Sequence, residues 1–202
     1  MRLHEYQAAP NSRRVHIFMA EKGIDLPRVP VDIRKGENLA DEFRVINPIG
    51  RIPVLELDHG SFLSESVAIC RYLEGLHAEP CLFGEQALEQ AHIEMWNRRA
   101  ELNLFREITM AFRNISGFFK DRETPVPEWG HICAETAAKA RPVFDAQLAK
   151  SEFLAGDRFS IADITLLVAV DFAGFAKISL PDAKYLTRWH ELVSARPSAS
   201  AQ

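Results

Sequence analysis

The hydrophobic pattern of the chain changes once, near residue 80, and this change constrains the fold more than any other feature. Before it, short apolar runs alternate with helical periodicity in the order β-α-β-α-β-β-α, and after it only helical periodicity remains. The first order favours a four-stranded mixed sheet with helices on both faces, and its last two strands form a hairpin around Asp58-His59-Gly60. We therefore predict an α/β domain over residues 1–78, a linker, and an all-helical domain over residues 85–202.

The individual elements are predicted from apolar spacing and from residues that begin or end helices. In the first domain, we expect strands at 2–6, 28–33, 54–57 and just before Ser64, and helices at 12–22, 39–45 and after Ser64. Pro30 cannot donate to a sheet ladder, so it either weakens the prediction of a strand at 28–33 or places that strand at an edge. In the second domain, we expect helices at 87–114, 131–150, after Ser160 and at 185–194. Pro142 predicts a kink or a boundary in the second of these helices, and Ser160 with Asp163 resembles a capping box.

Charge and composition argue against several classes of protein. The formal net charge is −4 and is not concentrated in either half, which disfavours a nucleic-acid-binding face. The longest apolar stretch, 161–176, contains Asp163 and Asp171, so it predicts a buried helix and no membrane span. The three cysteines form no CxxC motif and no histidine pair has metal-ligand spacing, so no metal site is expected. With no secretory signal, we expect reduced thiols and a cytoplasmic protein.

Pro53 and the serines that follow it indicate a ligand site in the first domain. Pro53 stands directly before the apolar strand 54–57, where it either begins the strand or, in a cis bond, keeps the Ile52 backbone free for a ligand. A helix begins at Ser64 or Ser66, within about fifteen residues of Pro53. Its unpaired N–H groups and partial positive charge suit a carboxylate. Two backbone features able to hold one extended polar ligand therefore lie close together in the sequence.

Several motifs spread over the chain resemble one family. They are Asn47-Pro48-Ile49-Gly50-Arg51-Ile52-Pro53-Val54-Leu55-Glu56, Leu63-Ser64-Glu65-Ser66-Val67-Ala68-Ile69, Phe153-Leu154-Ala155-Gly156-Asp157 and Ser160-Ile161-Ala162-Asp163. Together they are similar to the cytosolic glutathione S-transferases, with an N-terminal loop like that of bacterial, theta- or nu-like members. The resemblance implies a thioredoxin-like domain followed by an all-helical domain, glutathione as co-substrate, no metal, and a homodimer with a role in detoxification.

The resemblance also assigns roles in binding glutathione. The backbone of Ile52 pairs with the cysteinyl part of glutathione as an added strand would, and Pro53, in cis, holds that backbone open. Glu65 accepts a hydrogen bond from the α-ammonium group, and Ser66 at its helix N-terminus donates to the α-carboxylate. Arg51 and Asn38 fall at positions that meet the glycine end, where Arg51 would pair with the carboxylate. An equal alternative for Arg51 and Asn38 is a solvated loop.

The residues expected to activate the thiol lie at the start of the first predicted helix. Serine-type members carry their activating serine at the position of Ala9, which has no side-chain donor. Some bacterial members use an asparagine amide that aligns with Asn11, and Ser12 is the other nearby donor. We expect Asn11 or Ser12 to be catalytic, although both residue types also favour plain helix capping.

A small hydrophobic electrophile is expected in a pocket between the domains. Its candidate wall residues lie on the first long helix and are Trp96, Leu104, Phe105, Ile108 and Phe112, although aromatic residues at helical spacing are more often part of the core.

Three functions are compatible with these residues. The first is a glutathione transferase that conjugates the thiolate to an electrophile. The second is a glutathione-dependent isomerase, peroxidase or disulfide reductase on the same scaffold. The third is a non-enzymatic interaction module that binds RNA polymerase or translation factors. Pro53, Glu65 and Ser66 favour the first two, because an interaction module has no need of a glutathione site, whereas Ala9 keeps the third open.

Overall fold

The computed structural model describes residues 1–201, which divide into two compact units. The first unit contains residues 1–81 together with the segment that begins at Pro197, and the second contains residues 82–196. The change from one unit to the other falls inside the linker expected between residues 78 and 85. The segment from Pro197 onward was expected in the helical domain, and the structure instead groups it with the first unit. Gln202, at the end of the predicted helical domain, lies outside the described residues.

A four-stranded sheet forms the centre of the first unit. Its strands are β1 (Arg2–Glu5), β2 (Arg28–Pro30), β3 (Val54–Glu56) and β4 (Phe62–Ser64), in the order β2-β1-β3-β4. β1 and β2 run parallel, whereas β1 with β3 and β3 with β4 run antiparallel. The strand containing Pro30 is at an edge, as predicted from its missing N–H group. The arrangement is the thioredoxin-like mixed sheet that the first part of the sequence predicts.

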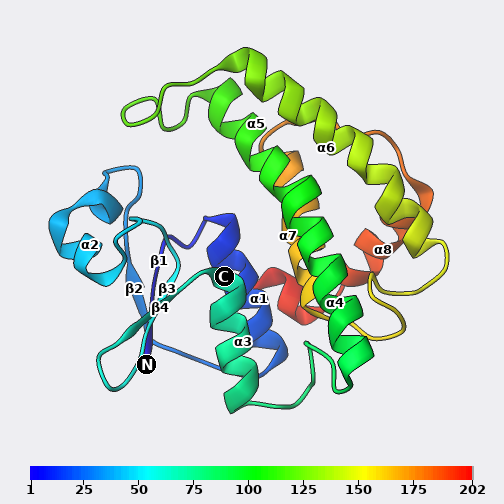
Figure 1. Ribbon diagram of the computed structural model, residues 1–202, viewed down its shortest axis with the longest axis horizontal. Coiled ribbons are helices and arrows are strands. Elements are labelled where there is room, and N and C mark those ends of the chain that lie inside the picture. Colours follow the sequence, from blue (N-terminus) through cyan, green and yellow to red (C-terminus); the bar gives the residue numbers. More distant parts are fainter. Residues whose placement is uncertain (202) are drawn as a thin grey trace. The chain divides into compact units, whose positions relative to one another are not determined.

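Helices cover both faces of this sheet (Figure 1). α1 (Pro10–Glu21) and α3 (Ser66–Leu76) pack side by side on one face, and η1 (Glu37–Leu39) and α2 (Asp41–Ile46) lie toward the other. A small core of Val31, Phe43 and Val54 joins α2 to the sheet. The two helices that begin near the predicted ligand site, α1 and α3, therefore share one interface.

α1 begins two residues earlier than predicted because Pro10 is its first residue. Proline suits that position, since its fixed φ is helical and its missing N–H group would be unpaired there in any case. The residue before it, Ala9, is the N-cap, with an extended backbone and no side-chain oxygen to cap the helix. The first N–H groups of α1 are consequently left without a side-chain cap.

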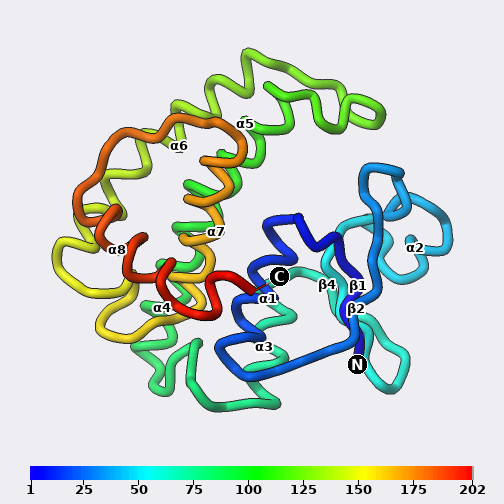
Figure 2. Tube along the Cα trace, turned by 180° about the vertical axis from the view of Figure 1, so that it is seen from behind, coloured from blue at the N-terminus to red at the C-terminus, as the bar shows by residue number. Residues whose placement is uncertain are grey.

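The segment beyond Pro197 forms a short 3₁₀ helix, η3 (Pro197–Ser200), that packs against α1. In Figure 2 the red segment runs alongside the blue α1. The side chain of Arg13 donates to the Ala199 carbonyl oxygen at 3.1 Å, and the Ser198 hydroxyl donates to Glu21. These two anchors, one near each end of α1, explain why the segment belongs with the first unit.

The second unit is all-helical, as predicted. Its elements are α4 (Ala87–Arg99), the π-helical turn η2 (Ala100–Phe105), α5 (Arg106–Ser116), α6 (Pro127–Leu148), α7 (Ile161–Phe175) and α8 (Lys184–Ser194). The single helix expected at 87–114 is continuous in Figure 1 but contains η2 in its middle. α6 begins at Pro127, earlier than expected, and passes through Pro142 without ending. Within residues 1–201, no helix is long and apolar enough to cross a membrane.

Asp163 organises the core of this second unit. Its carboxylate accepts a hydrogen bond from the Ser160 N–H group, which is one half of the predicted capping box at the start of α7, and another from the Ser160 hydroxyl group. It also accepts bonds from the Leu154 N–H group at 2.8 Å and from the Trp189 indole at 2.9 Å. Burial raises the pKa of Asp163 to about 6, and these hydrogen bonds oppose the rise. One buried carboxyl group thus connects α7, α8 and the loop before α7.

Candidate functional site

A loop of the first unit, residues 47–53, is held in shape by two buried asparagines. The Asn47 amide donates to the Arg51 carbonyl oxygen at 2.8 Å and accepts from the Ile49 N–H group at 3.2 Å. The Asn38 amide donates to the Gly50 carbonyl oxygen at 2.6 Å. The sequence patterns predicted Asn38 but not Asn47, whose only signal is that asparagine often bonds to the backbone two residues ahead. The loop that leads to Ile52 is therefore rigidly positioned.

Ile52 presents unpaired backbone groups at the end of this loop. The Ile52–Pro53 bond is cis, in agreement with the sequence-based prediction. β3 begins only at Val54, and within residues 1–201 neither the N–H nor the C=O group of Ile52 has a hydrogen-bond partner. A free donor and a free acceptor on one residue, in line with a strand, can receive the backbone of an extended peptide ligand.

Glu65 has an unusual backbone conformation at the start of α3. Its φ is 69° and its ψ is 113°, a combination that non-glycine residues rarely adopt. Such a conformation is found most often at functional sites, where the surrounding structure enforces it. The Glu65 side chain is exposed and does not cap α3. The next residue, Ser66, is buried and begins the helix, so the carboxylate and the helix N-terminus lie together.

Hydrogen bonds join the beginnings of α1 and α3. The Arg14 guanidinium Nη1 donates to the Ser66 hydroxyl oxygen at 2.7 Å and to Asn11 Oδ1 at 3.2 Å. The Ser66 hydroxyl also faces Asn11 Oδ1, at 3.4 Å. The structure thus brings together two predicted residues, Asn11 and Ser66, through a third that the sequence patterns missed. The available signal was the three-residue spacing of Asn11 and Arg14, which places both on one face of a helix.

The two candidate thiol donors differ in accessibility. Ser12 is fully buried, and within residues 1–201 its hydroxyl has no hydrogen-bond partner. Asn11 is only partly buried, and its amide nitrogen makes no hydrogen bond within the same residues. An amide nitrogen and the uncapped N–H groups of α1 are therefore the donors that this end of the site offers.

Arg51 and Asn38 also differ. Arg51 is exposed, and within residues 1–201 its guanidinium makes no recorded contact, so it is open to a ligand carboxylate. Asn38 is buried, and its amide nitrogen is committed to Gly50. Its Oδ1 is also buried, without a partner in the described part of the chain. The environment of Asn38 supports a role in holding the loop.

The five predicted electrophile-wall residues lie in the second unit. Four of them are buried, and Leu104 and Ile108 are completely so. Trp96 packs against Phe144, with ring centroids 6.2 Å apart. Phe112 is only partly buried and packs against Phe118 and Phe175, which are exposed. Phe112 is thus the member of the five with an accessible aromatic surface around it.

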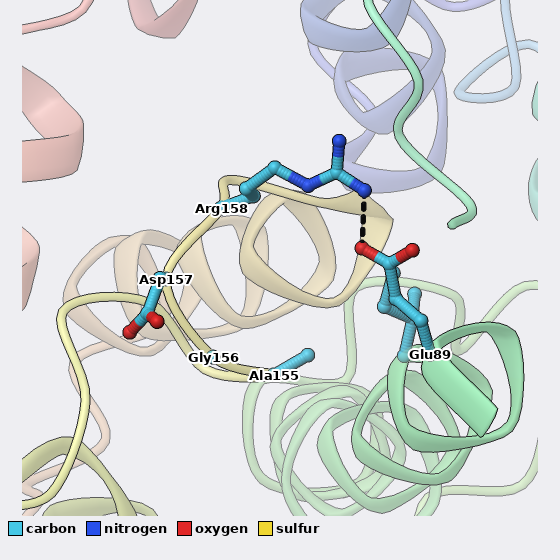
Figure 3. A pocket seen from close by; sticks show the side chains of 6 residues that line it. Glu89, Ala155, Gly156, Asp157 and Arg158 are labelled. Carbon is cyan, nitrogen blue, oxygen red and sulfur yellow. Dashed lines mark hydrogen bonds and ion pairs between the residues drawn. The ribbon is translucent and has the colours of Figure 1, made fainter. Parts of the chain in front are cut away.

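A separate surface pocket lies in the second unit (Figure 3). Its volume is about 270 Å³, and its lining consists of Glu89, Ile93, Ala155, Gly156, Asp157 and Arg158. Arg158 forms ion pairs with Glu89 and Glu85, and these pairs raise its pKa and lower that of Glu89. The positive charge of Arg158 in this pocket is therefore already balanced by two carboxylates. Among the described residues there is also no group of three or more histidine, cysteine or acidic side chains able to hold a metal ion.

Comparisons with known proteins agree with this division of the chain. A family model described as glutathione S-transferase, N-terminal domain, matches residues 8–76, and one described as glutathione S-transferase, C-terminal domain, matches residues 130–197. The chain is 34% identical to glutathione S-transferase 2 of Saccharomyces cerevisiae, over 98% of this chain and 87% of that protein.

Solved structures give the same result. A glutathione S-transferase domain-containing protein of Marinobacter aquaeolei matches with a TM-score of 0.96 and 39% identity, covering 99% of this chain and 100% of that chain. A class Gtt2 glutathione S-transferase of Vibrio parahaemolyticus matches with a TM-score of 0.88 and 37% identity, covering 99% and 96%.

Proposed function

Because the chain belongs to the glutathione S-transferase family, we propose that it binds glutathione, stabilises its thiolate and conjugates it to an electrophilic substrate. The observation that carries this proposal is the meeting of Asn11 and Ser66 at the adjoining N-termini of α1 and α3. Helix N-termini favour anions, and glutathione presents two anions to this region, the thiolate and the α-carboxylate.

We assign the parts of glutathione to the site from one end to the other. Ser66 and the free N–H groups of α3 receive the α-carboxylate, and the exposed Glu65 carboxylate receives the α-ammonium group. The unpaired N–H and C=O groups of Ile52 receive the cysteinyl backbone, as an added strand would. Arg51 pairs with the glycine carboxylate. Asn38 supports the loop at the glycine end of the site, because its side-chain amide donates to the Gly50 carbonyl oxygen.

The thiol is activated by donors at the start of α1. Lowering a free thiol pKa from about 8.5 to about 6.5 requires roughly 2.7 kcal/mol. A helix N-terminus contributes up to about 2 kcal/mol, and a hydrogen bond to a charged group about 1.5–3 kcal/mol. The uncapped N–H groups of α1 and the Asn11 amide are therefore sufficient together, with no general base and no metal. Asn11 is the preferred donor, because the Ser12 hydroxyl is completely enclosed.

The second substrate is proposed to be a small, apolar electrophile with an aromatic part. Phe112, with the exposed Phe118 and Phe175, offers the accessible aromatic surface among the predicted wall residues. The proposal further includes a homodimer in the cytoplasm.

Thermal unfolding with added glutathione tests the binding step. At a concentration of about 100 Kd, binding to the native state adds about 2.7 kcal/mol and raises the melting temperature. S-methylglutathione, which cannot react, should raise it similarly, and Glu65→Gln should weaken both shifts. Conjugation is then followed with a chlorodinitrobenzene as electrophile. A wild-type protein that melts at the same temperature with and without glutathione would refute the proposed function.

A further inference from the structure

We propose that Arg14 is a positioning residue of the glutathione site, which orients Asn11 and Ser66 at the same time. This inference rests on the proposed function. One nitrogen of its guanidinium, Nη1, donates to Ser66 Oγ at 2.7 Å and to Asn11 Oδ1 at 3.2 Å. Nη1 carries two hydrogens, so a single nitrogen can serve both acceptors. Arg14 thereby links the residue assigned to the thiol with the residue assigned to the α-carboxylate.

The position of Arg14 is unusual for a charged side chain. It is only 1% exposed, whereas arginine is almost never fully buried unless it is paired. It reaches from α1 to α3, where Cys70 and Glu74 are nearby ionisable groups. Lys22 forms an ion pair with Glu74 at 2.5 Å. Burial raises the pKa of the Cys70 thiol to about 12, and the Arg14 charge opposes that rise, so the charge acts on the adjoining turns of α3.

The contact with Asn11 fixes the direction of its amide. Oδ1 of Asn11 accepts from Arg14 and faces the Ser66 hydroxyl, so this oxygen is turned toward the helix interface. The amide nitrogen then occupies the opposite position, where it makes no hydrogen bond within the described residues. That nitrogen can donate only while the oxygen is held inward. Without Arg14 the amide would rotate freely, and its acceptor oxygen would face the thiolate part of the time.

The contact with Ser66 likewise orients a polar group, the Ser66 hydroxyl. Because Ser66 Oγ accepts from Arg14, one of its lone pairs is occupied and its own hydrogen is left to donate. In the structure the Ser66 hydroxyl donates this hydrogen to Asn11 Oδ1, with a long Oγ–Oδ1 distance of 3.4 Å. A bound α-carboxylate would receive it instead. The buried positive charge also favours both anionic groups of glutathione, since charges interact strongly at low dielectric.

The variant Arg14→Lys tests the inference, because it keeps the charge but not the fixed, planar donor geometry of the guanidinium. We expect KM for glutathione to rise roughly tenfold and the pKa of the bound thiol to rise by about one unit. The thiol pKa is followed by the ultraviolet absorbance of the thiolate. Lys22→Gln is the control, since it disturbs a different buried cation that joins α1 to α3 through Glu74. The control should lose stability while KM and the thiol pKa stay unchanged.

Epistasis separates positioning from general destabilisation. If Arg14 acts through Asn11 and Ser66, Arg14→Lys should have no further effect on KM or thiol pKa in an Asn11→Ala, Ser66→Ala background. A folded Arg14→Lys protein with wild-type KM and thiol pKa would overturn the inference. If Arg14→Lys does not fold, the cycle of Asn11→Ala and Ser66→Ala decides, because residues that share one donor must couple. Additive effects in that cycle would equally reject it. Failure of the wild type to bind glutathione would instead reject the proposed function.

Discussion

A single methyl group at Gly50 should disable the loop of residues 47–53, which we propose to bind glutathione. Gly50 has a φ of +66°, and a Cβ atom there would lie 2.8 Å from the Asn38 carbonyl oxygen. The left-handed backbone alone costs an alanine about 1–2 kcal/mol. The close contact is with backbone, which cannot rotate away, and overpacking of this kind adds about 1–3 kcal/mol. We therefore expect Gly50→Ala to lower the free energy of unfolding by about 2–5 kcal/mol in total.

Gly23 provides a matched control for this experiment. Its φ is +63°, nearly that of Gly50, but a Cβ atom there would have no neighbour within 4 Å. Gly23→Ala should therefore show the backbone cost of about 1–2 kcal/mol without the steric one. Equilibrium unfolding in urea measures both variants, and the difference between them isolates the clash with Asn38.

The same pair of variants tests how the loop serves binding. Relief of the clash must move residues 47–53 away from Asn38, which displaces Ile52 and the hydrogen bond from Asn38 to Gly50. KM for glutathione should consequently rise severalfold in Gly50→Ala and stay unchanged in Gly23→Ala. Equal losses of stability in the two variants, or an unchanged KM in Gly50→Ala, would show that this reasoning is wrong.

Three further changes have defined outcomes. Asp163→Asn should lower the free energy of unfolding, measured by urea titration, by about 3–5 kcal/mol, because the amide group places a donor against the donors of Ser160. The control Asp157→Asn changes an exposed residue and should be neutral. Arg2 and His4 hold the pKa of Glu56 at about 2, below the usual 4.5, so Glu56 stabilises the fold above pH 4.5 and loses this effect as the pH falls toward 2. The difference in melting temperature between wild type and Glu56→Gln should therefore shrink over that range, and a constant difference would contradict the assignment. Asn11→Asp removes the amide donor and adds a negative charge beside the thiol, so the bound thiol pKa should rise by about 1–2 units in an absorbance titration; an unchanged value would exclude Asn11 as donor.

Local chemistry made much of the fold predictable. Pro30 indicated an edge strand because proline has no N–H group, and Ser160 with Asp163 indicated a capping box because their spacing satisfies both partners. The starts of α1 and α6 were placed too late, at residues 12 and 131, since Pro10 and Pro127 occupy the first helical positions. Proline can mark either the beginning or the end of a helix, and the sequence alone does not distinguish these two cases.

Features that depend on distant parts of the chain were not predictable. An arginine in the middle of a helix is usually solvated, so nothing in the spacing around Arg14 reveals that α3 covers it. The π-helical turn at Ala100–Phe105 has no sequence signature in the apolar pattern. The docking of η3 on α1 joins residues more than 180 positions apart, as the contact of Arg13 with Ala199 shows. In each case the deciding neighbour is remote in sequence.

The return of η3 to α1 has a consequence for how the protein is made. Chains are synthesised from the N-terminus, and domains generally fold as they emerge from the ribosome. Residues 1–81 therefore emerge before the helical unit, but their last packing partner, Pro197–Ser200, is translated only after that unit. A ribosome paused inside the helical region would hold an α/β unit whose first helix is still uncovered on one side. Once residues 197–201 emerge, they cover this side of α1, which was translated almost two hundred codons earlier.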